Sequence, residues 1–174
     1  MDTKNIINQN GRYIHYLAAV VGSAILLLLD QYTKHLVLDR LKDHPPVILW
    51  KGVFQLEYLE NRGAAFGLFQ NQRVFFFASV IVITAVILWF YLRVPMERRF
   101  LPLRICAVFV MAGAWGNCID RITLNYVVDF LYFKLIDFPI FNVADIYVTV
   151  AAFAVAILIC FYYKDGDFER IMRR

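Results

Sequence analysis

The sequence predicts an all-α polytopic membrane protein with four transmembrane helices and a small extracytoplasmic β-rich element, built as one domain over residues 1–174. Two observations predict this fold class. Of all residues 61% are hydrophobic and only 18% are charged, which is the balance of a chain in a bilayer rather than in water. The apolar residues also gather in four stretches, each about as long as the ~20 residues that cross a ~30 Å hydrocarbon core. The predicted spans are 13–29, 74–92, 100–119 and 146–163, with outer regions at 30–73 and 120–145.

The four spans differ in how they meet the charged residues at their edges. The second and fourth contain no charge at all. The third holds Arg104 near its start, and we expect this side chain to reach toward the headgroups. The first is shorter, and its alternative interpretation is a cleaved secretory signal. Because no small-x-small cleavage site follows Leu29, a retained helix is predicted. Residues 30–41 either extend this helix or lie at the interface.

The outer regions carry strand patterns. In Val53–Glu60 the residues Phe54, Leu56 and Tyr58 alternate with their neighbours, a period-two pattern typical of a half-buried strand. Val127–Phe133 is β-branched and aromatic apart from one aspartate. We therefore expect a small sheet on the outer membrane surface, with a tight turn at Gly63–Gly67.

The basic residues predict the orientation. The side with both termini and the 93–104 connection holds ten Lys and Arg against five acids, and the other side holds eight against nine. By the positive-inside rule the first side is cytoplasmic, and the long polar regions face outward. The basic residues form no stripe with interleaved aromatics, so no nucleic-acid partner is predicted. The three cysteines lie inside predicted spans and are interpreted as small core residues.

Acids near the mouth of an apolar bundle are costly to desolvate, so each invites a functional interpretation. Asp129 sits alone among apolar neighbours, where burial would raise its pKa. Asp145 follows Asn142 by three residues at the start of a helix, where the dipole favours an anion. Asp120 is interpreted as a helix-end cap, beside Arg121, whose fork of donors suits a substrate carbonyl or a neighbouring carboxylate.

An inventory of side chains narrows the chemistry. Both serines, Ser23 and Ser79, lie inside apolar spans, and no H-E-x-x-H zinc motif is present. Two carboxylates that share a proton suffice for peptide hydrolysis, one activating water and the other polarising the scissile carbonyl. A Mg²⁺ or Ca²⁺ site made from Asp120, Asp129 and Asp145 is an open alternative, although the spacing of these residues is not diagnostic. Asp137, in a Leu-Ile-Asp-Phe-Pro loop, is interpreted as a solvated turn residue.

Five ordered motifs run along nearly the whole chain. They are Asp30-x-x-x-Lys34, Asn61-Arg-Gly-Ala-Ala-Phe-Gly67, Gly113-x-x-x-Asn117-x-x-Asp120-Arg121, Val127-Val128-Asp129-Phe130 and Phe141-Asn142-x-Ala144-Asp145. In these motifs, and in their order relative to the four spans, the sequence resembles the lipoprotein signal peptidases, also called signal peptidase II. It departs from that pattern at no position that the family treats as essential.

The resemblance implies a multi-pass enzyme of the bacterial inner membrane that cleaves diacylglyceryl-modified prolipoproteins just before the lipidated cysteine. Asp129 and Asp145 would be its catalytic pair, and no cofactor or metal would be needed. Membrane lipid and cyclic peptide antibiotics that occupy the dyad would be its other partners. The residues that would position the substrate or support the site are Asp30, Lys34, Asn61, Gly113, Asn117, Asp120, Arg121 and Asn142.

Two other classes remain alternatives. An ion- or proton-coupled transport protein would use the outer-face acids as a relay, and it predicts charged groups near the bilayer midplane. The acids of interest here lie instead at span boundaries, and no internal repeat is evident. A structural or scaffold protein predicts that the outer acids can be removed without loss of activity.

Overall fold

The computed structural model describes residues 3–63 and 72–172 of the chain. Within them four helices are long and apolar enough to cross a membrane, as the sequence predicted. Two further helical pieces follow the fourth of these, a π-helical turn at Leu158–Tyr162 and a short helix, α5 (Asp165–Met172). The four long helices are α1 (Thr3–Arg40), α2 (Arg73–Arg93), α3 (Leu101–Thr123) and α4 (Val143–Ile157).

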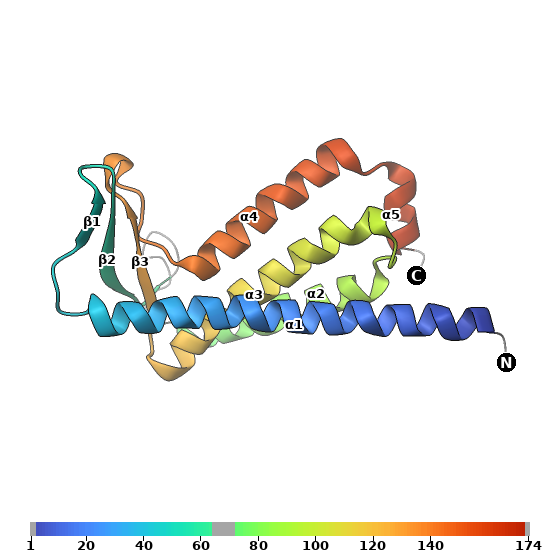
Figure 1. Cartoon of the computed structure of the whole chain (residues 1–174), viewed down its shortest axis with the longest axis horizontal. Helices are drawn as coiled ribbons and strands as arrows, with labels where there is room; N and C mark the ends of the chain where they lie inside the picture. The colour runs from blue at the N-terminus through green and yellow to red at the C-terminus, as the bar shows by residue number, and fades with distance from the viewer. Residues whose placement is uncertain (1–2, 64–71, 173–174) are drawn as a thin grey trace.

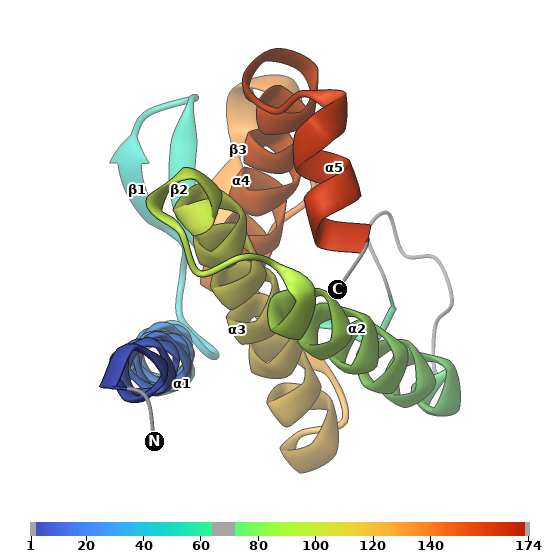
Figure 2. The ribbon, with the colours of Figure 1, turned by 90° about the vertical axis from the view of Figure 1, so that its right-hand side faces the viewer.

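Helix α3 is the centre of the bundle, with α1, α2 and α4 packed around it (Figure 2). Two of its glycines explain how closely the neighbours approach. A methyl group at Gly113 would lie 2.5 Å from the backbone oxygen of Ala144, and one at Gly116 would lie 2.5 Å from Oδ2 of Asp30. Any larger side chain at these positions would push α4 or Asp30 away from α3.

A three-stranded antiparallel sheet lies at one end of the bundle, with its strands running across the helix axes (Figure 1). Its strands are β1 (Val47–Trp50), β2 (Phe54–Asn61) and β3 (Val127–Phe133), in the order β1-β2-β3. The two predicted strands are confirmed, and β3 has the predicted bounds. Strand β1 was missed because its four residues are all apolar, so they carry no period-two alternation.

The end of α1 nearest the sheet settles the two possibilities left open for residues 30–41. The helix continues to Arg40, because Val37 and Leu41 pack in a buried cluster with residues of β3 and the turn before it. The cluster contains Val37, Leu41, Tyr126, Val128 and Phe130. This packing fixes the sheet to α1, and with it the position of β3.

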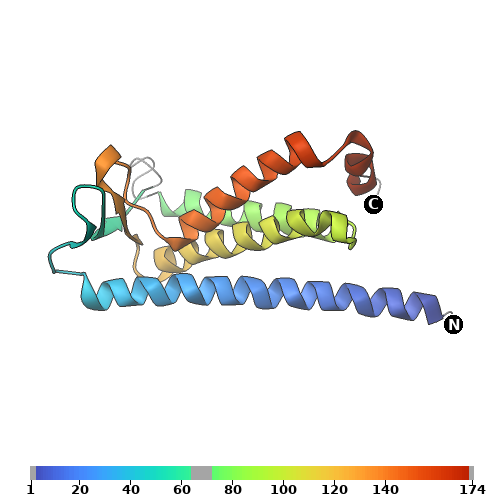
Figure 3. The same ribbon diagram turned by 45° about the horizontal axis from the view of Figure 1, so that its top comes forward.

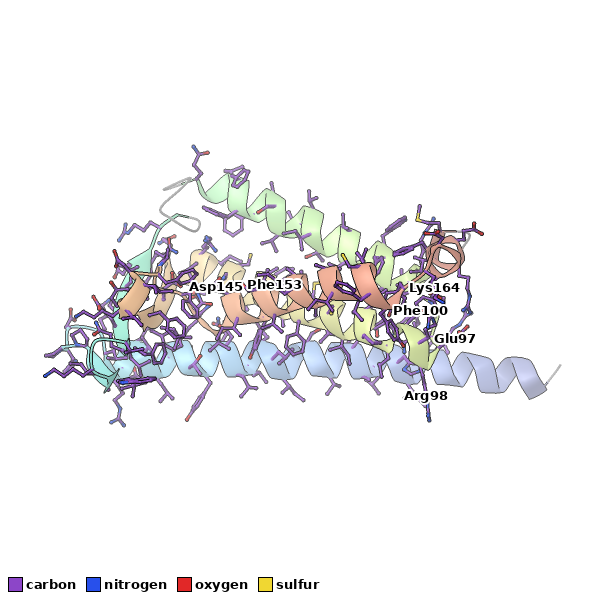
Figure 4. The ribbon with its side chains drawn as sticks, turned by 90° about the horizontal axis from the view of Figure 1, so that it is seen from above. Glu97, Arg98, Phe100, Asp145, Phe153 and Lys164 are labelled. Carbon is purple, nitrogen blue, oxygen red and sulfur yellow. The ribbon has the colours of Figure 1, made fainter. Side chains whose placement is uncertain are left out.

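Both termini lie at the end of the bundle opposite the sheet, together with the α2–α3 connection and α5 (Figure 3). Helix α5 is held there by a bidentate ion pair, in which Arg99 donates to Asp167 over 2.8 and 2.6 Å. The rings of Phe100 and Tyr163 stack at 5.7 Å beside it. In Figure 4 the side chains of Glu97, Arg98, Phe100 and Lys164 gather at this end, and Asp145 lies at the other.

Two expectations about the spans are corrected. Arg104 does not reach toward the headgroups: it is buried and donates to the backbone oxygens of Pro95 (2.7 Å) and Glu97 (3.4 Å), which ties down the α2–α3 connection. Of the three cysteines two are buried in α3, but Cys160 is exposed. It lies on the last turn of the fourth span, where no other helix of the described chain covers it.

Candidate active site

Asp145 and Asn142 form the start of α4. Asn142 is the N-cap residue: its side chain accepts from the backbone N–H of Asp145 (3.0 Å), and the Asp145 carboxylate accepts from the backbone N–H of Asn142 (3.1 Å). This reciprocal pair is a capping box, and it satisfies two donors that the helix terminus leaves free. The three-residue spacing predicted that both side chains share one face. The capping box holds Asp145 at a fixed point beside β3.

Asp129 lies on β3 with 1% of its surface exposed; two asparagines join it to Asp145, and a third holds its other oxygen. Asn142 donates to one carboxylate oxygen of Asp129 over 2.6 Å, and Asn61 donates to the other over 2.8 Å. Asn117 donates to Asp145 over 2.7 Å and accepts from Asn142 over 3.0 Å. The two aspartates are thus joined through a continuous chain of hydrogen bonds, and each carboxylate is an acceptor in it.

The orientation of each of these three asparagine amides is determined by the hydrogen bond that its oxygen accepts. The oxygen of Asn117 accepts from Nζ of Lys34 (2.9 Å), and that of Asn61 accepts from the backbone N–H of Gly63 (3.0 Å). The oxygen of Asn142 is occupied by the first turn of α4. The NH₂ group of each of the three must therefore face a carboxylate, since a flipped amide would lose the hydrogen bond that its oxygen accepts.

Behind the asparagines lies a buried charge cluster centred on Lys34, which is 2% exposed. Its Nζ lies 2.9 Å from Oδ2 of Asp30 and 3.0 Å from Oδ2 of Asp120. Asp120 also accepts from the backbone N–H of Val128 (3.1 Å), and Asp30 accepts from that of Ala144 (2.9 Å). The cluster therefore links α1 and α3 to both β3 and α4, the two elements that carry the aspartates.

The interpretation of Asp120 as a helix-end partner agrees with these contacts. The open alternative of a divalent cation site does not, since Asp120 is engaged with Lys34 rather than with Asp129 and Asp145. Among residues 3–63 and 72–172 no group of three or more His, Cys, Asp or Glu side chains is arranged to hold a metal.

Loss of Lys34 should destabilise the whole fold. In Lys34→Met two buried carboxyl groups lose their only opposite charge within the cluster, and breaking a buried pair in this way costs about 3–5 kcal/mol. The matched control is Lys42→Met, which removes a half-exposed pair with Glu60 at 3.7 Å and should change the unfolding free energy by about 1 kcal/mol or less. Thermal unfolding in detergent measures both. A Lys34→Met protein that unfolds at the wild-type temperature would contradict the stabilising function of the cluster.

The electrostatics distinguish Asp129 from an ordinary surface carboxylate. Its pKa is raised to about 7, first because burial disfavours the charged form and second because the Asp145 carboxylate lies nearby. Hydrogen bonds from Asn61 and Asn142 oppose this by favouring the ionised form. Near neutral pH the pair can therefore hold one proton between two carboxylates, which is the state required for acid–base work on a peptide bond.

Arg121 lies beside the pair but bonds to the backbone. Its guanidinium donates to the backbone oxygens of Asn117 (3.1 Å) and Gly63 (2.9 Å) and stacks 4.0 Å from the ring centroid of Phe76. These contacts fix the end of β2 and the start of α2 against α3. The predicted turn at Gly63–Gly67 lies almost wholly outside the described residues, so only its first residue is placed.

A cavity of about 880 Å³ opens at the two aspartates and is lined by residues of α2, α3 and α4. Its polar end holds Asn61, Asp129 and Asp145, together with Asn117, Gly113 and Arg121. The remaining walls are mostly apolar. They come from the spans, including Phe76, Val80, Ile83, Val110 and Val148, and from residues 138–141 before α4. The site is therefore the polar mouth of an apolar groove, the form of a site that takes a ligand with a long apolar part.

Some site residues had no signal in the sequence. Gln31 donates to Asp120 over 2.9 Å and to Asp30 over 3.2 Å, so it completes the buried cluster. A single glutamine next to a predicted span carries no sequence signal for such a contact. The apolar groove residues look like any other residues of their spans. The predicted residues Asp30, Lys34, Asn61, Asn117, Asp120 and Asn142 all meet in the network, with Gly113 and Arg121 on the cavity wall.

Comparison with known proteins identifies relatives over most of the chain. The family model described as signal peptidase (SPase) II matches residues 23–161. A lipoprotein signal peptidase of Symbiobacterium thermophilum is 46% identical over 136 residues, covering 77% of this chain and 88% of its own. One from Brevibacillus brevis is 42% identical over 158 residues, covering 90% and 99%. A solved bacterial membrane enzyme superposes with a TM-score of 0.74 at 26% identity, covering 85% of this chain and 92% of its own.

Proposed function

The chain belongs to the signal peptidase II family, and from that premise we propose that it is an aspartic endopeptidase with Asp129 and Asp145 as its catalytic pair. It is a membrane peptidase that processes lipoprotein signal peptides. The finer proposal is that its substrates are diacylglyceryl-modified prolipoproteins and that it cleaves just before the lipidated cysteine. The observation that carries the mechanism is the pair of carboxylates, joined by asparagines, at the polar mouth of an apolar groove.

The proposed reaction needs one proton on the pair. The raised pKa of Asp129 favours that residue as the acid, which polarises the scissile carbonyl while ionised Asp145 takes a proton from water. The hydroxide equivalent adds to the carbonyl carbon and gives a tetrahedral intermediate. The C–N bond then breaks as a carboxyl group returns a proton to the leaving amine. The products are a free signal peptide and a mature chain with a free amino-terminus.

The supporting residues act through position in this proposal. Asn61, Asn117 and Asn142 hold the carboxylates as acceptors, and the Lys34 cluster holds Asn117. Gly113 lies on the cavity wall against Ala144, where any side chain would displace the start of α4. Cyclic peptide antibiotics that act on this family would bind in the same groove, against the dyad.

The pH dependence follows from the raised pKa. Asp129 holds its proton below about pH 7, and as the pH rises through that value it ionises and the acid is lost. We therefore expect kcat/KM to fall by about tenfold per pH unit above about 7, since kcat/KM reports the free enzyme. Rates with a lipid-modified precursor over a pH series test this, with Asp137→Asn as a control that should follow the same profile. A rate that stays constant into the alkaline range would contradict a shared proton.

We also propose the orientation. The chain lies in a bacterial inner membrane with both termini and the α2–α3 connection in the cytoplasm and with the sheet and dyad on the outer face. The asymmetry of Lys and Arg between the two ends supports this. Precursors exported across the membrane would then meet the site on the side where they emerge.

Cysteine labelling tests the orientation. After replacement of Cys106, Cys118 and Cys160, an impermeant thiol reagent on intact cells should label Asp137→Cys and not Arg98→Cys, two positions that are both exposed at opposite ends of the bundle. After the cells are broken open, both should react. Labelling of Arg98→Cys alone in intact cells would reverse the model.

Product mapping tests the proposed reaction. Purified protein in lipid vesicles is incubated with a diacylglyceryl-modified precursor, and both products are identified by mass spectrometry. We expect the mature product to begin at the modified cysteine. Cleavage at another bond, or none, would overturn the proposed specificity.

A further inference from the structure

The free end of the sheet carries an unusual apolar surface. All four residues of the edge strand β1 are exposed, from 47% for Val47 to 69% for Trp50. The turn after β3 adds Leu135 and Ile136, each 69% exposed. We call the surface formed by Ile48, Leu49, Trp50, Leu135 and Ile136 the sheet tip.

The two parts of the sheet tip form one surface. The backbone N–H of Leu135 donates to the oxygen of Val53 in the β1–β2 turn over 3.3 Å, and the rings of Phe54 and Phe133 lie 4.8 Å apart beneath it. Aromatic contacts then continue to the start of α4, since Phe133 stacks on Phe141 at 5.8 Å and Phe138 meets Phe141 at 5.7 Å. The sheet tip is therefore continuous with the apolar surface where the fourth span begins.

Charged residues of both signs surround the sheet tip, and its two lysines are free of ion pairs within the described residues. Lys51 and Lys134 flank it, both exposed, and neither is in an ion pair with a carboxylate of the described chain. The nearby acids have local partners: Asp137 accepts from the hydroxyl of Tyr132 over 2.5 Å, and Glu57 accepts from Gln55 over 2.6 Å. A partner of this surface should thus be apolar at its centre, with anionic groups where Lys51 and Lys134 lie.

The position of the sheet tip indicates which partner this is. The strands run across the axes of the spans, so the tip projects sideways from the bundle, away from α1, near the depth at which the spans end (Figures 1 and 3). An exposed apolar edge strand in water is a site of aggregation. Tryptophan and lysine, by contrast, are favoured where lipid headgroups meet acyl chains.

We propose that the sheet tip is a membrane anchor that inserts into the phospholipid headgroup layer, with its apolar side chains among the upper acyl chains and Lys51 and Lys134 at the phosphates. The insertion is shallow, because the free backbone edge of β1 would lack hydrogen-bond partners in the hydrocarbon core. The anchor would fix the depth of the sheet, and with it the depth of Asp129 on β3. It does not depend on whether the dyad cleaves peptides.

Depth-dependent fluorescence quenching tests the anchor. Trp89→Phe and Trp115→Phe leave Trp50 as the single tryptophan of the chain. The full-length protein is reconstituted in vesicles of zwitterionic and anionic phospholipids that are brominated either near the headgroup or near the methyl end of the acyl chains. Trp50 emission should be quenched more strongly by the headgroup-proximal bromines and only weakly by acrylamide in the water.

Each other pattern would overturn the proposal. Quenching by acrylamide alone would place the tip in water, and stronger quenching by the deep bromines would contradict a shallow edge strand. Protection from both quenchers would indicate that a second protein strand covers β1.

Matched variants assign the effect to the surface itself. In the single-tryptophan protein, Leu135→Asp with Ile136→Asp should markedly reduce quenching by the headgroup-proximal bromines, whereas Met172→Asp, exposed at the opposite end, should not change it. Unchanged quenching in the double variant would contradict the proposal that Leu135 and Ile136 belong to the anchor. If that variant fails to fold, the quenching of Trp50 in the single-tryptophan protein still tests the anchor.

Discussion

Asp129→Asn and Asp145→Asn are each expected to abolish cleavage of a lipid-modified precursor while the protein stays folded. Asparagine keeps the shape of aspartate but can neither take a proton from water nor share one, and loss of general acid–base catalysis costs at least ~10²-fold in rate. In the structure each carboxylate accepts hydrogen bonds from two donors. An asparagine in its place offers one oxygen and one NH₂ group, so one of the two donors would face the NH₂ group instead of an acceptor. That donor cannot turn away, because its own orientation is fixed. One hydrogen bond is thereby lost, at a cost of about 1 kcal/mol.

That structural cost must be separated from the chemistry. Gel filtration and thermal unfolding in detergent should show both variants folded and at most slightly less stable than the wild type. The matched control is Asp137→Asn, an exposed residue outside the network, which should retain nearly full activity. If either Asp129→Asn or Asp145→Asn turned over at a near-wild-type rate, the assignment of the catalytic pair would be wrong.

The spans and two strands could be predicted because their patterns are local. Long apolar runs identify the helices, and β3 has its predicted bounds because Val127–Phe133 is an unbroken β-branched and aromatic run apart from Asp129. Strand β1 and the extension of α1 to Arg40 could not be predicted, since both depend on what packs against them. The burial of Arg104 is of the same kind: its partners are backbone oxygens of a connection that no sequence pattern fixes.

The candidate site was predictable in part for the same reason. The spacing of Asn142 and Asp145 places both side chains at a helix start, where a capping box holds them. The contact of Lys34 with Asn117 joins residues that are 83 positions apart, and only the packing of α1 on α3 creates it. Local reasoning therefore identifies the residues that carry charge, and the tertiary structure determines which carboxylates meet a proton donor.

The distribution of buried charge bears on the transport alternative. Within the described residues, the buried charged groups lie at the sheet end, in the Lys34 cluster and at Asp129, or at the opposite end, at Arg104 and Asp167. A proton or ion pathway through the bundle would need polar groups between these ends. The groove instead becomes apolar away from the dyad, as expected for a site that is open to one face and to lipid.

Substrate choice should depend on the lipid. In the proposed reaction the diacylglyceryl group would keep the modified cysteine at one depth, so that the bond before it meets the two carboxylates. Positioning of this kind supplies several kcal/mol of a barrier. Acyl chains that move from bilayer to protein groove gain little of the ~0.8 kcal/mol per methylene available on leaving water. The lipid would therefore act mainly by setting the position of the scissile bond relative to the two carboxylates. The unmodified precursor should be cut very poorly.

The most direct measurement compares the lipid-modified and the unmodified forms of one precursor at matched concentration in the same vesicles. Wild-type protein should cleave the modified form before its cysteine and leave the unmodified form almost intact, and Asp145→Asn should cleave neither. Equal rates for the two forms would contradict lipid-guided cleavage and would indicate a peptidase that recognises the peptide sequence alone.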